Sequence, residues 1–191
     1  EIPKRDWSSD VCSSDLYWYR FLAGGETSPV GRTRTFPLPG RTPQHLRFAI
    51  ACCQNFGFGY FNSYRQMAAD DLDLILHLGD YIYEETWGTP VRTQPVNPRS
   101  LADYRNLHAL YKTDLDLQEA HASCPWAVTW DDHEVQDDYA GDVAIDDESP
   151  ETFLLRRAAA YQAYYEHMPL HAAARPQGPN ARLFRNLKIG R

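Results

Sequence analysis

The sequence predicts an α/β fold, because strand and helix signals alternate along the chain. Three short apolar segments are strand-like, at residues 46–52, 72–78 and 126–130. Helical patterns separate or follow them, at residues 61–69, 100–112, 114–121 and 151–167. Each apolar segment also runs into polar residues, and in α/β sheets ligand sites form where strands end.

The strand predictions rest on the apolar pattern of each segment. Leu46, Phe48 and Ile50 alternate with other residues, which is typical of a strand with one buried face. Residues 72–78 read LDLILHL and are apolar enough for a buried strand. We expect His77, inside that strand, to be a core histidine.

The helix predictions rest on capping residues and on spacing. Ser100 and Asp103 have the spacing of a capping box, and apolar residues recur at helical intervals from Leu101 to Tyr111. Pro150 precedes the helix predicted at residues 151–167. The acid-rich residues 137–151 are interpreted as a solvated loop.

The first 16 residues differ from the rest of the chain. Residues 6–16, DWSSDVCSSDL, match the in-frame translation of a common short-read sequencing adapter, and KIGR at residues 188–191 fits the start of such an adapter. We therefore expect residues 1–16 to be a sequencing-adapter artefact and give them no role in the fold.

Residues 17–36 contain two extended runs around a Gly/Ser/Pro turn region, which predicts a β-hairpin. Two strands alone are marginal in water, so we interpret residues 17–36 as the end of an N-terminal β-sandwich domain. Residues 37–44 include three prolines and are predicted to be a linker. Residues 45–191 then form the second domain.

Charge and composition count against several classes of protein. The formal net charge is −7, whereas nucleic-acid-binding proteins are usually basic, so we expect no nucleic acid binding module. No apolar run approaches the roughly 20 residues of a membrane helix, so we expect no membrane span. The adjacent Cys52 and Cys53 do not suit a disulfide scaffold.

Three successive strand ends carry groups that bind metal ions. The first strand runs into Cys52, Cys53 and Gln54, the second into GDYIYE at residues 79–84, and the third into DDHE at residues 131–134. Since the carboxyl ends of strands converge at one edge of an α/β sheet, these groups should meet. A thiol, phenols, carboxylates and an imidazole together suit metal ions.

Structural alternatives exist for each of these groups. Asp80 could cap a following helix, Cys53 could be a small buried hydrophobe, and residues 131–134 could be a solvated loop. Like charges this close repel one another, however, and a bound cation is the usual relief.

The ordered motifs resemble the PhoD-like alkaline phosphatases and phosphodiesterases of the calcineurin-like metallophosphatase group. The resemblance rests on RFAIACCQ (47–54), GYFNSYRQMA (59–68), DLDLILHLGDYIYE (71–84), LADYRNLHALYKTD (101–114) and WAVTWDDHEVQDDYAGD (126–142). It extends over residues 17–187, and the combination of HLGDYIYE with TWDDHE is its most specific part.

The resemblance implies a fold, cofactors and a location. It implies the N-terminal part of a four-layered αββα metallophosphatase domain, preceded by the remnant of an immunoglobulin-like β-sandwich. It implies Fe(III) and Ca²⁺ as cofactors, with Cys53, Asp80 and Tyr83 as iron ligands and Asp80 also binding calcium. A secreted or periplasmic location is implied as well.

The same resemblance implies roles around residues 131–134, which stand where the wider group has a Gly-Asn-His motif. Asp132 is expected to bind metal on the calcium side, with Asp131 as a weaker candidate. His133 is expected to donate a proton or to stabilise the phosphate. Arg105 is a candidate phosphate-binding residue, with an exposed helix salt bridge as its alternative. Asp137 stands where the family often has Asn.

The implied activity is metal-dependent hydrolysis of phosphomonoesters or phosphodiesters by a metal-activated water. The family's catalytic domain continues past residue 191, so we expect a truncated, inactive fragment of a longer enzyme. Two alternatives remain open. One is a non-catalytic calcium-binding or adhesion module, extracellular, that uses the β remnant at residues 17–36 and the acidic residues 137–151. The other is a thiol hydrolase that uses Cys53 and His133.

Overall fold

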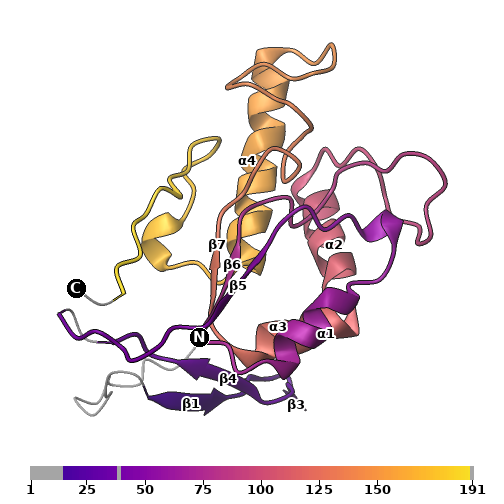
Figure 1. Cartoon of the computed structure of the whole chain (residues 1–191). Coiled ribbons are helices and arrows are strands. Elements are labelled where there is room, and N and C mark those ends of the chain that lie inside the picture. The colour runs from indigo at the N-terminus through magenta and orange to yellow at the C-terminus, as the bar shows by residue number, and fades with distance from the viewer. Residues whose placement is uncertain (1–14, 38–39, 190–191) are drawn as a thin grey trace.

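The structure, a computed structural model, describes residues 15–37 and 40–189 and confirms a mixed α/β fold (Figure 1). The predicted adapter-derived segment, residues 1–16, lies outside the described residues except for Asp15 and Leu16. Of residues 188–191, the last two lie outside them as well.

A parallel three-stranded sheet lies at the centre of the fold. Its strands are β5 (Phe48–Ala51), β6 (Leu74–His77) and β7 (Trp126–Val128), and β6 lies between the other two. These are the three predicted strands, each shorter than expected. Because all three run in the same direction, the loops that follow them leave the same edge of the sheet.

The predicted helices are all present. They are α1 (Asn62–Ala69), α2 (Leu101–Tyr111), α3 (Leu115–Ser123) and α4 (Pro150–His167), with short 3₁₀ helices η1 (Phe56–Phe58) and η2 (Ala172–Ala174). The capping box is confirmed, because the Asp103 N–H donates to Ser100 Oγ at 3.2 Å and the Ser100 N–H donates to the Asp103 carboxylate at 2.8 Å. Pro150 is the first residue of α4, and Ser149 is its N-cap.

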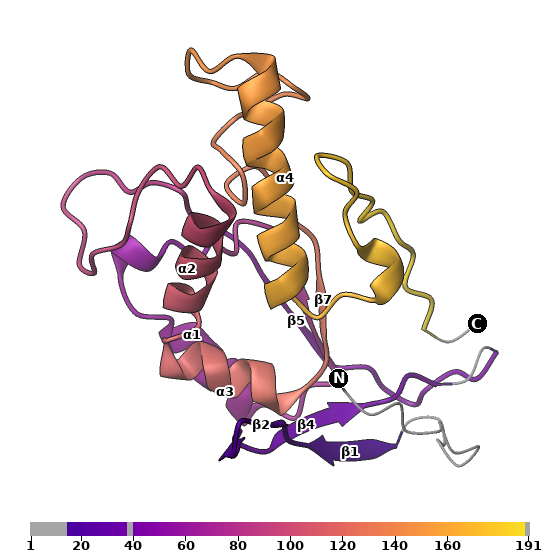
Figure 2. The ribbon, with the colours of Figure 1, turned by 180° about the vertical axis from the view of Figure 1, so that it is seen from behind.

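Helices α2 and α3 lie beside the sheet, to its right in Figure 1 and to its left in Figure 2, and α4 projects upward past the strands in both views. The core beneath them is rich in tyrosine; its fully buried rings include Tyr81, Tyr104, Tyr111 and Tyr164. The hydroxyl groups tie elements together, as where Tyr104 Oη donates to Val135 O at 2.6 Å. On the edge strand β5, Phe48 and Ile50 are exposed.

The N-terminal hairpin is also present. Its long strands are β1 (Leu16–Tyr19) and β4 (Gly31–Arg34), which pair antiparallel, and β2 (Leu22–Ala23) pairs with β3 (Glu26–Thr27) at the tip. Arg32 forms an ion pair with Asp71 at 2.6 Å, and Arg34 forms one with Asp73. These pairs attach the hairpin to the segment that enters β6.

The acid-rich segment at residues 137–151 is not simply solvated, so that prediction is wrong for its second half. Asp146 and Glu148 both form ion pairs with Arg99, the former at 2.8 Å. Glu148 also lies 3.4 Å from Arg156, whose side chain is buried. These carboxylates connect the start of α2 to α4.

None of the described helices is long and apolar enough to cross a bilayer.

Replacement of a core leucine should show how far these helices support the fold. Leu107 on α2 is 1% exposed, so Leu107→Ala should lower the free energy of unfolding by about 2–5 kcal/mol in a urea titration. Leu155 on α4 is 73% exposed, and Leu155→Ala is the matched control, with an expected change within about 0.5 kcal/mol. Equal effects of the two changes would contradict the packing described here.

Candidate metal centre

The loops after β5 and β6 stay side by side beyond the ends of the strands. The Cys53 N–H donates to Gly79 O at 3.2 Å, and the Gln54 N–H donates to Asp80 O at 3.1 Å. These bonds continue the strand pairing by two residues and bring Cys53 beside Asp80.

Both of these residues have left-handed backbones. The φ angle is 54° at Cys53 and 55° at Asp80, which costs an L-residue about 1–2 kcal/mol. Strained residues of this kind concentrate at functional sites, where neighbouring structure holds them in place. The alternative that Asp80 caps a following helix is wrong, since α2 is the next described helix and Ser100 is its N-cap.

Gly79 allows the loop after β6 to approach the loop after β7. Its φ is 122°, and a Cβ built there would lie 2.6 Å from both the backbone N and the Cβ of Asp131. Because atoms cannot approach that closely, any side chain at position 79 would push the two loops apart.

Glu134 ties the same two loops together from within the protein. Its buried carboxylate accepts backbone hydrogen bonds from Tyr81 at 2.6 Å, Asp131 at 2.8 Å and Asp80 at 3.2 Å. Burial raises the pKa of Glu134 to about 8, although the N–H donors oppose this shift. Three bonds to one carboxylate fix the spacing of the candidate ligands on both loops.

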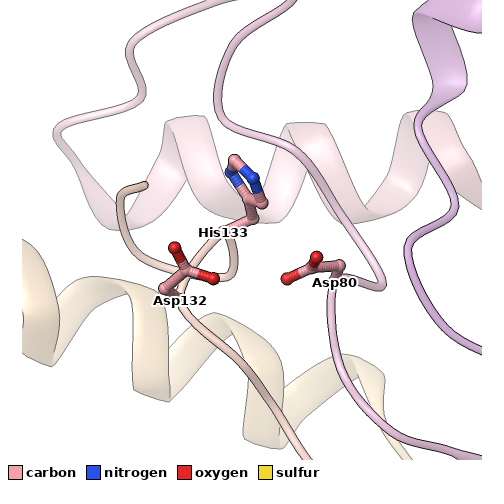
Figure 3. Close-up of side chains that lie close together, drawn as sticks. All are labelled: Asp80, Asp132 and His133. Carbon is pink, nitrogen blue, oxygen red and sulfur yellow. The ribbon is translucent and has the colours of Figure 1, made fainter. Parts of the chain in front are cut away.

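Asp80, Asp132 and His133 form the centre of the site. One ligand atom from each lies within 4.8 Å of the others, and Figure 3 shows the two carboxylates facing one another with the imidazole beside them. Asp80 Oδ1 is buried and accepts no hydrogen bond from the described residues. A buried carboxylate oxygen without a partner is costly, and a bound cation would satisfy it.

Cys53 and Tyr83 also contact Asp80. Tyr83 Oη donates to Asp80 Oδ2 at 3.0 Å. Cys53 is exposed, so the alternative of a small buried hydrophobe is wrong. Partial desolvation, followed by contacts with Cys52 and Asp80, raises the pKa of its thiol to about 12. Burial and the charge of Asp80 also raise the pKa of Tyr83. Asp80 is therefore shared by all the candidate ligands, and this donor set of carboxylates, phenol and thiol fits a cation.

Glu84 holds the imidazole of His133. The His133 Nδ1 and Glu84 Oε2 are 2.8 Å apart, and Glu84, only 2% exposed, also accepts the backbone N–H of Asp137. Burial acts to lower the pKa of His133, but the hydrogen bond and charge of Glu84 outweigh it and raise the pKa to about 9.

A second acidic group adjoins the first through Asp132. The carboxylates of Asp132, Asp137 and Asp138 also offer oxygens within 4.8 Å of one another. Asp131, the weaker candidate, is held beside them by Glu134, and burial raises its pKa. This arrangement places five aspartates, including Asp80, around the ends of β6 and β7.

Arg105 has partners elsewhere in the fold. Its guanidinium donates two hydrogen bonds to Glu166 on α4, from Nε at 2.6 Å and from Nη2 at 2.7 Å. The salt bridge considered as the alternative in the sequence is therefore present. The structure does not bring Arg105 into the cluster around Asp80, and a phosphate contact stays a prediction.

Two residues of the site had no role in the sequence analysis. Glu84 and Glu134 stand inside the motifs GDYIYE and TWDDHE, yet acidic residues in such motifs look like further surface charge. Their near-complete burial is what reveals their function as hydrogen-bond acceptors. The only available signal was their position at the ends of two motifs that already held candidate ligands.

The chain is similar to known proteins over most of its length. A model of the PhoD-like phosphatase family matches residues 48–191. The chain is 48% identical over 182 residues to alkaline phosphatase D from Bacillus subtilis (strain 168), an alignment that covers 92% of this chain and 31% of that protein. A solved structure described as that of PhoD superposes with a TM-score of 0.89 at 48% identity, over 93% of this chain and 35% of the other. The chain thus spans about a third of the length of these relatives.

Gly79→Ala should test whether the close approach of the loops is required. The new Cβ meets backbone at 2.6 Å, so the free energy of unfolding should fall by about 1–3 kcal/mol and metal affinity should fall as well. Gly88 also has a positive φ, of 67°, but nothing lies within 4 Å of its Cβ position, so Gly88→Ala is the control for backbone strain alone. Calorimetry of both variants should find the larger loss in Gly79→Ala; equal losses would remove the steric argument.

Proposed function

Because the chain belongs to the PhoD-like phosphatase family, we propose that it supplies the metal-binding part of an enzyme that hydrolyses phosphoesters with a metal-activated water. One observation carries the proposal. One buried oxygen of Asp80 accepts no hydrogen bond from the residues that the structure describes, and it lies where three parallel strand ends meet, among further anionic ligands and a histidine. The substrates proposed are phosphomonoesters, phosphodiesters or both.

Fe(III) and Ca²⁺ are the proposed metals. Cys53, Asp80 and Tyr83 would hold the iron, and Asp80 and Asp132 would hold calcium, with Asp137 as a further oxygen donor. Carboxylate and phenolate oxygens suit hard cations, and a bound metal would keep Tyr83 and Cys53 deprotonated. When bound, such metals activate water and stabilise the charge on the phosphate oxygens.

The residues of this chain supply orientation and a proton. Glu84 engages Nδ1 of His133 at 2.8 Å, and Nε2, which lies 3.5 Å from Asp137 Oδ1, is the nitrogen proposed to act on a substrate. In the protonated ring, Nε2 would carry the proton that passes to the oxygen of the leaving group. Glu84 is thus proposed as a positioning residue, acting through His133.

The activity is proposed for a protein that has this chain together with the remaining length of its relatives. The chain spans about a third of the length of its relatives, and the family resemblance implies further Asp and His ligands in the remaining length. We therefore expect the isolated chain to turn over little substrate. A four-layered αββα domain, an immunoglobulin-like origin of the hairpin and a secreted or periplasmic location are further proposals that rest on the family resemblance.

Both alternative functions have less support in the structure. In a calcium-binding module built on residues 137–151, Asp146 and Glu148 would not be free to bind calcium, because they already form ion pairs with Arg99 and Arg156. A thiol hydrolase needs a thiolate, whereas the pKa of Cys53 is raised to about 12. Its thiol contacts Cys52 and Asp80, not an imidazole base.

Removal of the shared carboxylate should abolish metal binding. For Asp80→Asn we expect metal content to fall at least about tenfold after dialysis, measured by inductively coupled plasma mass spectrometry, and hydrolysis of p-nitrophenyl phosphate by the full-length protein to be lost. Asp142, an exposed aspartate outside both acidic groups, provides the control variant Asp142→Asn. If Asp80→Asn keeps both metals, the proposed centre is wrong. Cys53→Ser and Tyr83→Phe should each lose iron, and unchanged metal affinity in both variants would favour the calcium module.

The positioning role of Glu84 predicts an effect that depends on the leaving group. In the full-length enzyme, Glu84→Gln should lower kcat roughly 10- to 100-fold with little change in KM. The loss should be larger for methyl phosphate than for p-nitrophenyl phosphate, because a poor leaving group needs the proton of His133 most. Glu85→Gln is the neighbouring control. Equal losses for both substrates would indicate a merely structural role.

A further inference from the structure

We propose that Trp87 and Phe58 form an aromatic wall that stacks against a ring on the ester group of the substrate. This inference rests on the proposed function and narrows its substrate class. It assigns the site to phosphoesters whose leaving group carries a ring with a flat apolar face, in preference to small alkyl phosphates.

The position of Trp87 ties the wall to the reacting end of the site. The Trp87 ring centroid lies 6.2 Å from that of His133, with 27° between the two planes, and 5.9 Å from that of Tyr83. The Tyr83 and His133 rings are themselves 4.0 Å apart. The indole therefore lies next to the imidazole that is proposed to protonate the leaving group.

Trp87 and Phe58 are both half exposed. Phe58 belongs to η1 and meets Trp87 edge to face, with 5.3 Å between ring centroids and 80° between planes. Phe58 is 49% exposed and Trp87 is 48% exposed. Two large aromatic side chains kept in contact with water at the rim of a polar site are typical of a surface that binds an apolar group.

The backbone on both sides of the wall is held in place. The Val91 N–H donates to Gly57 O at 2.7 Å, which joins the loop after β6 to η1. A Cβ at Gly57 would lie 3.3 Å from Thr86 Cβ, so glycine permits this close approach.

Arg92 holds the same loop in place through two contacts. Its guanidinium lies 3.6 Å from the centroid of the Phe56 ring and binds Asp114 at 2.8 Å. The Asn97 N–H donates to Glu84 O at 2.7 Å, which fixes the far end of the loop beside the residue that positions His133. The indole is thus pre-organised, and stacking on it would cost little ordering entropy.

The chemistry of the leaving group connects these observations. His133 would donate its proton to the ester oxygen, so the carbon group bonded to that oxygen must lie next to His133 and hence near Trp87. A ring at that place can cover the exposed indole face, whereas a methyl group cannot. Stacking should therefore strengthen binding of the ring-bearing ester and leave the phosphate contacts unchanged.

Two stable phosphonates separate the ring contact from phosphate binding in the full-length, metal-loaded protein. Phenylphosphonate and methylphosphonate share the charged head and differ in the ring. We expect Trp87→Ala to weaken phenylphosphonate as a competitive inhibitor roughly three- to tenfold and to leave methylphosphonate unchanged. Trp87→Phe should recover part of the loss. Trp18, 65% exposed on the hairpin strand β1, gives the control variant Trp18→Ala.

A fluorescence titration provides a readout that does not require turnover. Phenylphosphonate should change the tryptophan emission of the unmodified protein and of Trp18→Ala, but not that of Trp87→Ala. Equal affinity of Trp87→Ala and the unmodified protein for phenylphosphonate would overturn the proposal. So would a failure of acrylamide to quench the fluorescence of Trp87 in the full-length protein, because the indole would then be inaccessible to a ligand. If neither phosphonate binds the metal-loaded protein at all, the proposed function itself fails.

Discussion

The carboxylate of Glu134 is the interaction on which the site depends. It accepts three backbone N–H groups from the loops after β6 and β7, and Gly79 removes the side chain that would keep those loops apart. Without this buried tie, the mutual repulsion of Asp80 and Asp132 would favour separation of the loops. The ligands are thus held close together by hydrogen bonds to the backbone, not by attraction among themselves.

The site stores unfavourable energy that a cation would relieve. Cys53 and Asp80 have left-handed backbones, and one oxygen of Asp80 is buried without a described partner. Desolvation also raises the pKa values of Cys53 and Tyr83, so the uncharged thiol and phenol are favoured when no cation is bound. A metal ion reverses this preference, and metal binding should therefore be coupled to release of protons.

The arrangement also separates two tasks between the strand ends. Asp80, at the end of the central strand β6, contacts the candidate ligands from β5 and β7, so one carboxylate links both halves of the centre. Glu84, four residues after Asp80, orients His133 through a hydrogen bond and is not in contact with Cys53, the proposed metal ligand that follows β5. The loop after β6, which Val91 ties to η1 and Arg92 ties to the N-cap of α3, then places Trp87 beside the imidazole. The residues proposed to bind metal, to position the proton donor and to contact the ester group thus follow one another along the loop after β6.

The sequence by itself determined the order of strands and helices, the capping of α2, and the candidate ligands Cys53, Asp80, Tyr83, Asp132 and His133. Apolar periodicity and capping residues are local properties, and the motifs at the strand ends could be compared directly with a family. The roles of Glu84, Glu134, Trp87 and Glu148 were decided only by the tertiary structure. A charged side chain can be solvated, form an ion pair or accept hydrogen bonds inside the protein. Which of these occurs depends on burial and on partners about 50 residues away, and no local sequence pattern contains that information.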